Sequence, residues 1–271
     1  MHIVVCVKQI QNPEIASALL RVDESTNKMR LAASVPPVMS PFDEQAVEAA
    51  LRVREAHGDA ADGIKITAIT LGPETARQVL KAALSLGVDE GVLLSDPACQ
   101  DGDSYSTALT LSRAVGKIGD VDLVITGRQA ADFDAGVVGC GLAELLDIPA
   151  ISFVRKVDVE GDVVRVERVI ENGYEIQEAM LPALVTISHE FGPPRKASLR
   201  ETMRAARKPI TAWSVEDLDL EAGQVGVSGS RRVLERLFIP SSDIKCEFIN
   251  GVTTEDMARE LARRLHEANV L

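Results

Sequence analysis

The sequence predicts an α/β fold: a mostly parallel, doubly wound sheet with an antiparallel ribbon and an extended C-terminal arm. Three observations lead to this prediction. Short apolar runs alternate with amphipathic helical stretches up to about residue 146, a pattern typical of parallel α/β units. Apolar and polar residues then alternate one by one between residues 151 and 187. Beyond Pro209 the chain has little periodicity and many turn residues.

The first half of the chain supplies the parallel units. Ser40 and Pro41 mark a helix start, with Ser40 as the N-cap and Pro41 at the first helical position. Gly87 is placed to end a later helix. In order, we expect a strand at 3–7, a helix at 40–56, a strand at 65–71, a helix at 74–86, a strand at 91–94, a helix at 104–118, a strand at 121–127 and a helix ending at 146.

The second half predicts the ribbon and the arm. Glu160, Gly161 and Asp162 form a hairpin turn within the alternating segment, so an antiparallel ribbon is expected to join the sheet. From 209 to about 249 we expect an arm that lies on a partner chain, followed by a helix at 254–268. The chain is therefore divided into an α/β domain at 1–208, which includes a segment at 190–208 discussed below, and an arm with its helix at 209–271.

Composition excludes several classes of protein. The 271 residues carry 29 Lys and Arg against 41 Asp and Glu, a net charge of −12, and 3% are aromatic. Such a chain repels phosphate backbones and has few stacking platforms, so nucleic acid is not an expected partner. Its four cysteines form no C-x-x-C pair, which argues against a metal cluster or a disulfide framework. With neither a signal peptide nor a membrane-length apolar run, we expect a cytoplasmic protein without membrane insertion.

The loop from Gly127 to Gly139 is the first candidate site. It joins the carboxyl end of a strand to a helix N-terminus, where α/β sheets bind ligands and free backbone N–H groups favour phosphate. Asp132 and Asp134 have the wrong charge for a phosphate clamp, so they would bind a ribose hydroxyl, cap N–H groups or orient neighbouring donors. From the spacing alone, a tight turn with Asp caps is an equal alternative. Neither G-x-G-x-x-G nor a P-loop occurs, so neither an ordinary dinucleotide fold nor a phosphate-hydrolysing one is indicated.

The basic stretch from Pro194 to Lys208 is the second candidate. It holds six cations, and Leu199 and Met203 would share one helix face beside Arg200 and Arg204. A solvated helix face is the interpretation that composition alone favours. The alternative is a docking element with an apolar anchor and steering cations.

No catalytic group is visible in the sequence. The four histidines are scattered, and no G-x-S-x-G or H-E-x-x-H motif occurs. Asp103 is placed to cap the helix that follows it, and Glu167 with Arg168 suits cross-strand charge pairs. The residues alone therefore indicate a nucleotide-binding α/β subunit without catalysis of its own.

Seven segments occur together in the order of a known family. The chain resembles the beta (small) subunit of electron transfer flavoprotein, and the match covers nearly its whole length. The matching segments are 4–9, Ser40-Pro41-Phe42-Asp43, Gly72-Pro73, 127–134, 166–168, 181–186 and 194–210.

The resemblance implies an adenine-nucleotide-binding α/β fold and a heterodimer. An alpha subunit would hold most of a redox-active FAD shared between the chains. The beta subunit would hold AMP, or a second FAD in electron-bifurcating members. Ser40 stands where the family usually has Asn, and Ala135, Val137 and Val138 replace polar side chains, which leaves phosphate binding more to backbone N–H groups. The implied cofactor-binding residues are Cys6, Ser40, Pro41, Phe42, Asp43, Leu71, Gly127, Arg128, Gln129, Ala130, Asp132, Asp134, Val137, Val138 and Gly139.

The basic stretch resembles the family's recognition loop, in which a Leu anchors an acyl-CoA dehydrogenase. Leu199 matches that anchor, and Arg195, Arg200 and Met203 are the other implied docking residues. Glu167 falls where members place a carboxylate near the mobile flavin domain. The implied function is an electron carrier that accepts electrons from a dehydrogenase flavin and passes them to another redox partner.

Three other functions remain open. The first is a bifurcating flavoprotein that oxidises NADH at a beta-side FAD. The second, from another class, is a nucleotide-binding enzyme or sensor that acts alone. The third is a purely structural interaction protein.

Overall fold

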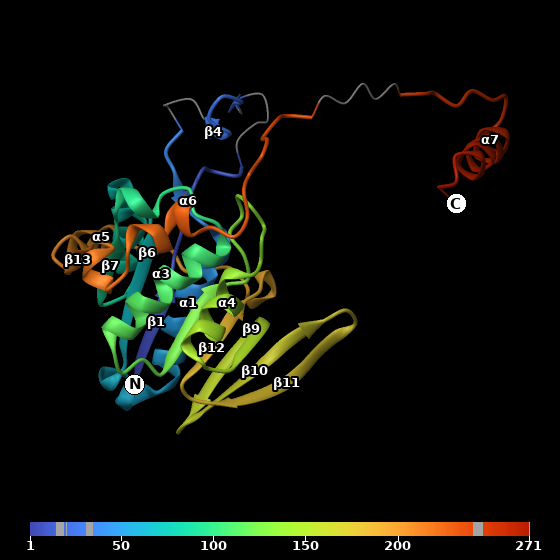
Figure 1. Cartoon of the computed structure of the whole chain (residues 1–271). Helices are drawn as coiled ribbons and strands as arrows, with labels where there is room; N and C mark the ends of the chain where they lie inside the picture. Colours follow the sequence, from blue (N-terminus) through green and yellow to red (C-terminus); the bar gives the residue numbers. More distant parts are fainter. Residues whose placement is uncertain (15–18, 20, 31–34, 241–245, 271) are drawn as a thin grey trace.

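A nine-stranded sheet forms the centre of the computed structural model, which describes all residues except 15–18, 20, 31–34, 241–245 and 271 (Figure 1). The order across the sheet is β11-β10-β9-β12-β8-β1-β6-β7-β13. The strands are β1 (His2–Cys6), β6 (Lys65–Leu71), β7 (Glu90–Leu94), β8 (Leu123–Gly127), β9 (Ala150–Glu160), β10 (Val163–Ile170), β11 (Gly173–Met180), β12 (Ala183–Ile187) and β13 (Ile210–Trp213).

The order in which the chain adds parallel strands to the sheet reverses at β1. β1 pairs in parallel with β6 on one side and with β8 on the other. The chain passes outward from β1 to β6 and β7, and then crosses to β8 and β12 on the far side of β1. The carboxyl ends of β1 and β8 therefore flank a topological switch point, where open α/β sheets bind their ligands.

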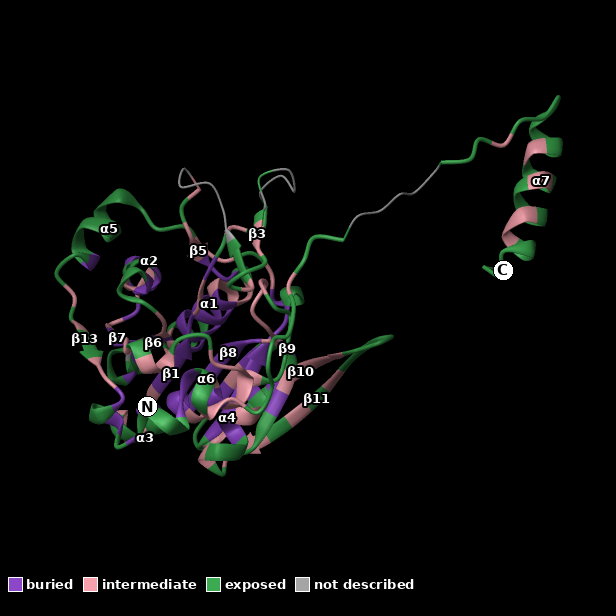
Figure 2. Cartoon of the chain, turned by 45° about the horizontal axis from the view of Figure 1, so that its top comes forward, coloured by how far each residue is buried: buried purple, intermediate pink, exposed green. Residues whose placement is uncertain are grey.

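Helices bury both faces of the sheet, which confirms the doubly wound arrangement. Ile3 and Val5 of β1 belong to the core under α1 (Pro41–Ala56) and α2 (Arg77–Leu86). Val4 and Cys6 belong to the core under α3 (Ser104–Ile118) and α4 (Val138–Leu146). Figure 2 shows this buried interior in purple. Continuous apolar strands are the usual result of such double coverage.

The antiparallel ribbon joins the sheet as expected. β9 pairs in parallel with β12, and β10 and β11 follow in antiparallel order. Gly161 and Asp162 make the β9–β10 turn. Glu167 accepts a hydrogen bond from Arg155 (Nε to Oε2, 2.8 Å), and Arg168 pairs with Glu175 at 2.8 Å. The expected cross-strand charge pairs are thus present.

Several short elements carry too few residues for a periodic signal. Two small antiparallel pairs join β2 (Gln9–Ile10) to β5 (Val38–Met39) and β3 (Arg21–Asp23) to β4 (Lys28–Arg30). The short helices are α5 (Leu199–Ala205), α6 (Gly226–Gly229) and the 3₁₀ turns η2 (Gly58–Gly63), η3 (Glu74–Ala76), η4 (Pro97–Cys99), η5 (His189–Phe191), η6 (Glu216–Leu218) and η7 (Ala222–Gln224). The longer α7 (Thr254–Glu267) is the helix that the sequence predicts at 254–268.

The chain leaves the sheet later than the sequence predicts. β13 lies within the segment expected to be extended, yet it pairs in parallel with β7 at the sheet edge. Val215, Leu218 and Val225 are buried in the α3–α4 core. This part resembles an extended arm in the sequence because it shows no helix or strand period. Its strand has only four residues, and its buried apolar residues are separated by 3₁₀ turns. Of the expected arm, residues 241–245 lie outside the described part of the chain.

Two side chains hold the beginning of the arm against the body. Asp103 caps α3 at the Ser106 amide (2.9 Å), and its other carboxylate oxygen accepts from the amides of Arg231 (2.8 Å) and Arg232 (3.0 Å). Asn27, in the β3–β4 turn, accepts from the Leu237 amide and donates to the Glu235 carbonyl, both at 2.9 Å. Residues 231–237 are therefore fixed at two points.

The last helix, α7, lies away from the sheet in both views (Figures 1 and 2). None of its residues is buried. Met257, Leu261 and Leu265 repeat at intervals of four and so share one side of the helix. Other large apolar side chains of the arm are also exposed, among them Val233 (82%), Phe248 (80%) and Val252 (97%). The arm therefore presents apolar surface without covering it.

Candidate nucleotide site

Asp43 links the carboxyl ends of β1 and β8 at the switch point. It lies in the first turn of α1, and its carboxylate accepts hydrogen bonds from the backbone amides of Lys8 (2.8 Å) and Gly127. A Cβ at Gly127 would lie 2.5 Å from Asp43 Oδ1 and 2.8 Å from Phe42 Cβ, so only glycine permits this approach. Burial raises the pKa of Asp43 to about 7, against the two amide hydrogen bonds.

The two aspartates of the loop after β8 orient neighbouring donors. Asp132 forms an ion pair with Lys8 Nζ at 2.8 Å, which ties the loop to the segment after β1. Asp134, in the left-handed region (φ 48°), accepts from Gln129 Nε2 at 2.7 Å. Both carboxylates thus bind donors of this chain, one of the three roles that the sequence leaves open for them. Phe133, 68% exposed, lies beneath Lys8 with 5.4 Å from Nζ to the ring centre.

Arg128 joins this loop to the segment after β12. Its guanidinium lies over the rings of Phe42 (4.9 Å) and Phe153 (5.8 Å), and its Nη1 lies 3.2 Å from His189 Nδ1. Phe153 occupies the left-handed region (φ 59°), a strained conformation for a bulky residue. Arg128 Nε is buried and has no hydrogen-bond partner. One donor is thus left for a ligand or for water.

Other unpartnered polar atoms lie at the same edge. Ser40 Oγ and Thr70 Oγ1 are buried without a partner, Ser40 directly before α1 and Thr70 at the end of β6. Native proteins rarely leave such atoms unsatisfied, so they indicate a polar ligand or ordered water. The residues present therefore fit the neutral base and ribose of a nucleotide.

The beginning of α4 is the part of the site that is suited to an anion. Val137, the N-cap, makes no side-chain cap, so amides of the first turn remain available to an anion. A Cβ at Gly139 would lie 2.7 Å from Thr126 Oγ1 and 2.9 Å from Thr186 Cγ2, so glycine is needed for α4 to start this close to the sheet. Because Ala135, Val137 and Val138 have no side-chain donors, a phosphate at this place would be bound by backbone N–H groups.

The remaining residues of the predicted pocket lie around the same edge of the sheet. Cys6 is buried at the end of β1, and burial raises the pKa of its thiol to about 12, so it packs as an unreactive group. Leu71 ends β6, and Pro41 begins α1. Ala130 accepts from the Asp134 amide through its carbonyl, and Val138 begins α4. The predicted pocket residues thus lie at the carboxyl ends of β1, β6 and β8, in the loop after β8, and at the beginnings of α1 and α4.

Four further residues belong to the site but were not predicted: Lys8, Thr70, Phe153 and His189. Lys8 had a signal in the sequence, because it directly follows a buried strand and faces the acidic loop that follows another. Thr70 resembles any buried strand residue. Phe153 and His189 reach the site only because β12 lies next to β8 and β9 lies next to β12.

The basic stretch forms a second feature on another part of the surface. Ser198 caps α5 by a capping box with Glu201, and Ala205 is buried under the helix. Leu199 is 79% and Met203 68% exposed, and Arg200 is exposed between them. Arg195, expected among the docking residues, instead turns its guanidinium toward Glu48 and Glu55 of α1.

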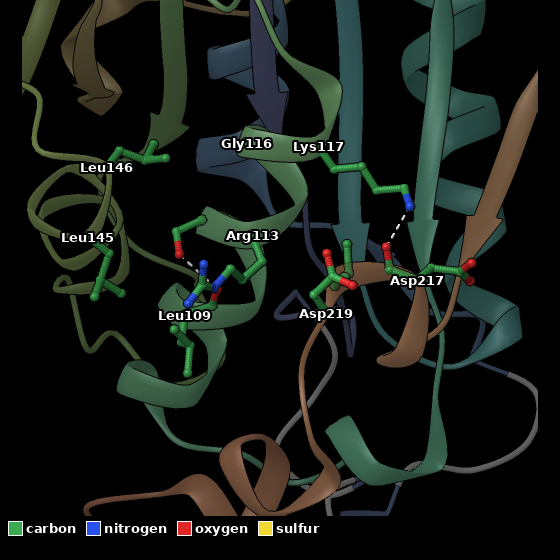
Figure 3. A pocket seen from close by; sticks show the side chains of 10 residues that line it. Leu109, Arg113, Gly116, Lys117, Leu145, Leu146, Asp217 and Asp219 are labelled. Atoms are coloured by element: carbon green, nitrogen blue, oxygen red, sulfur yellow. Dashed lines mark hydrogen bonds between the residues drawn. The ribbon is translucent and has the colours of Figure 1, made fainter.

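A hollow of about 570 Å³ lies between α3, the end of α4 and the segment that contains η6 (Figure 3). Lys117 donates a hydrogen bond to the Asp217 carbonyl at this hollow. Apolar Leu109, Leu145 and Leu146 alternate there with charged groups. None of the predicted site residues lines this hollow.

The fold and the carboxyl-edge site define a class, the doubly wound α/β subunits with a candidate nucleotide site at the switch point. Comparison with known proteins narrows this class. Residues 29–218 match the family model described as "Electron transfer flavoprotein domain". The chain belongs to the electron transfer flavoprotein family, and the resemblance to its beta subunits is confirmed.

Full-length relatives agree with this assignment. The chain is 36% identical to "Electron transfer flavoprotein subunit beta" of Thermoanaerobacterium thermosaccharolyticum, covering 100% of each. It is 34% identical to "Caffeyl-CoA reductase-Etf complex subunit CarD" of Acetobacterium woodii, again over 100% of each. It is 36% identical to "Protein FixA" of Azorhizobium caulinodans, over 89% of this chain and 85% of that one. The function is thus electron transfer of the beta-subunit type.

A separate observation concerns membranes. Within the described residues, no helix combines the length and the apolar character that crossing a membrane requires.

Proposed function

We propose that this chain is the beta subunit of a heterodimeric electron transfer flavoprotein that accepts electrons from an acyl-CoA-type dehydrogenase and passes them to another redox partner. The observation that carries the proposal is α5, a capped helix with exposed Leu199 and Met203 and exposed cations on a chain of net charge −12. The name of one relative, a subunit of a caffeyl-CoA reductase complex, supports a partner that acts on CoA thioesters.

The arm supports an alpha subunit as the permanent partner. Phe248, Val252 and the Met257–Leu261 side of α7 together expose more apolar surface than scattered single residues normally do. Burying these side chains on a second chain would stabilise the pair by roughly 1.5 to 3 kcal/mol per large side chain. The arm would thus hold the alpha subunit, with which the chain would share an FAD.

The carboxyl-edge site supports a nucleotide held by this chain alone. Ser40 Oγ, Thr70 Oγ1 and Arg128 Nε offer uncommitted hydrogen-bonding atoms, and the first turn of α4 offers amides to a phosphate. We assign AMP to this site, with Asp43, Asp132 and Asp134 holding the loops that surround it. A bound FAD at the subunit interface would supply the redox chemistry, while the residues of this chain bind, position and dock.

The first experiment is a count of nucleotides. The chain is purified with its alpha subunit, the complex is denatured, and released FAD and AMP are quantified per heterodimer. One FAD with one AMP is the expected result. Two FAD without AMP would replace the simple carrier by a bifurcating flavoprotein that oxidises NADH. An empty carboxyl-edge site would contradict the nucleotide assignment.

The second experiment tests docking with Leu199→Ala. Because the side chain is 79% exposed, its removal leaves stability unchanged, whereas its burial on a dehydrogenase is lost. At about 0.8 kcal/mol per buried carbon group, losing three groups predicts about 2 kcal/mol, or roughly a 30-fold lower kcat/KM for reduction by the dehydrogenase. FAD content should not change. Equal rates for the variant and the wild type would reject docking by α5.

A further inference from the structure

The segment that leads into α5 is held on the outer side of α1 by Arg195. Its Nε donates to Glu48 Oε2 at 2.7 Å and its Nη2 to Glu48 Oε1 at 3.3 Å. Its Nη1 and Nη2 donate to the two carboxylate oxygens of Glu55, at 2.5 and 2.9 Å. The Arg195 amide also donates to Glu48 at 3.1 Å. One guanidinium thus binds two carboxylates one above the other on a helix.

Other side chains of α1 extend this attachment along the same side. Gln45 Nε2 donates to the carbonyls of His189 and Gly192, both at 3.2 Å. Arg52 donates to Glu48 Oε1 at 2.7 Å and lies over the Phe191 ring at 4.9 Å. Positions 45, 48, 52 and 55 repeat every three or four residues, so they form one stripe of the helix. The stripe therefore follows the chain from residue 189 to 195.

Glu48 makes this attachment firm, because it is not a surface carboxylate. Its side chain is 6% exposed. Burial alone would raise the pKa of Glu48, but hydrogen bonds from Arg195 and Arg52 hold it below its ordinary value. A buried carboxylate in such contacts is costly to leave without its cation. Pro193 and Pro194 stiffen the chain directly before Arg195.

The other end of α5 is held separately, on α2. Ala205 is buried in the core beneath α2, and Lys208 Nζ donates to the carbonyls of Leu84 and Val88 at the end of that helix. The docking helix is thus anchored before its first residue and after its last. Between these anchors, Leu199 and Met203 project into solvent.

From this arrangement we propose that Arg195 is a positioning residue: with Glu48 and Glu55 it fixes the docking helix α5 in the orientation that binds the partner dehydrogenase. The proposal rests on the proposed function of α5. In this proposal Arg195 does not contact the partner, because its guanidinium N–H groups already donate to Glu48 and Glu55 of this chain. Arg200 and Arg204 remain exposed for that role.

The direction in which Glu55→Gln changes binding of the partner distinguishes positioning from charge steering. Glu55 is 58% exposed on α1 and is not part of the docking helix. If only charge mattered, Glu55→Gln would remove a negative charge near a basic surface and strengthen the encounter with an acidic partner. If Glu55 holds Arg195, the same change frees the segment and weakens binding.

The test uses the FAD-containing heterodimer and a purified acyl-CoA dehydrogenase supplied with its acyl-CoA substrate. Arg195→Ala and Glu55→Gln should speed hydrogen exchange of amides 195–199 and raise the KM for the heterodimer with kcat unchanged. If the competent orientation falls to about a tenth of the population, KM rises about tenfold. Leu199→Ala should raise KM without faster exchange. Arg165→Ala and Glu178→Gln, a matched exposed pair on the ribbon, should change neither quantity.

The outcomes distinguish this inference from the function on which it rests. If Leu199→Ala leaves KM unchanged, docking by α5 is wrong and the inference falls with it. If Leu199→Ala raises KM while Glu55→Gln lowers it or leaves it alone, docking stands and the positioning role of Arg195 is wrong. Faster exchange together with a higher KM in both Arg195→Ala and Glu55→Gln supports the proposal.

Discussion

The buried carboxyl of Asp43 should make the stability of the chain depend on pH. Its folded pKa is about 7 against an ordinary value of 3.8. Between these values the folded chain keeps the proton and the unfolded chain loses it. Stability from this group is therefore highest near pH 4 and falls as the pH rises through 7. The cause is burial, which two amide hydrogen bonds only partly offset.

The magnitude follows from the shift. Three pKa units at 1.36 kcal/mol each give about 4 kcal/mol as the full effect, of which about 2 to 3 kcal/mol falls between pH 5 and pH 8. Asp43→Asn removes the titrating group and keeps the shape of the side chain, although an amide has one acceptor oxygen instead of two. Its own constant cost should be about 1 to 3 kcal/mol.

Urea unfolding of both proteins, followed by circular dichroism at pH 5, 6, 7 and 8, measures this difference. The free energy of unfolding of the wild type should fall relative to that of Asp43→Asn by about 2 to 3 kcal/mol across the series. Groups that titrate alike in the two proteins cancel in the comparison. Two curves that remain parallel from pH 5 to pH 8 would show that Asp43 is ionised throughout and that the burial argument is wrong.

Two further predictions concern backbone fit and the arm. Gly127→Ala should lower stability by about 1 to 3 kcal/mol, because its Cβ would lie 2.5 Å from Asp43 Oδ1. The control Gly116→Ala, which has open space around its Cβ, should raise stability by up to about 1 kcal/mol. Equal melting temperatures of the two variants would contradict the close approach at Gly127. Asn27→Ala should speed proteolysis within 231–240 at an unchanged melting temperature, and Ser25→Ala in the same turn should not; equal cleavage would mean that Asn27 does not hold the arm.

Most of the fold could be predicted because the longer strands and helices each carry their own signal. The strands at 65–71 and 91–94 and the helices at 41–56 and 104–118 have apolar runs or stripes long enough to show a period. β13 could not be predicted, because four residues carry no period and their pairing with β7 is decided by a neighbour over 100 residues away.

The sequence predicts those parts of the site that lie directly after a predicted strand. The loop after Gly127 lies at a strand end, which the sequence places directly. Arg128 illustrates the limit: its partners come from α1, β9 and η5, and only the order of the strands brings them together. Arg195 illustrates another, because a cation in a basic stretch gives no hint that its partners are two glutamates on a distant helix.

The anchoring of residues 231–237 has a consequence for how tightly a second chain can be held. From 238 to 253 the chain has 16 residues, so α7 can reach at most about 55 Å beyond its last fixed point. A partner bound by both the body and α7 would meet the second surface at an effective concentration in roughly the millimolar range. Each contact can then be weak on its own while the pair is stable. A single cut in this connection would turn one durable complex into two independent, short-lived ones.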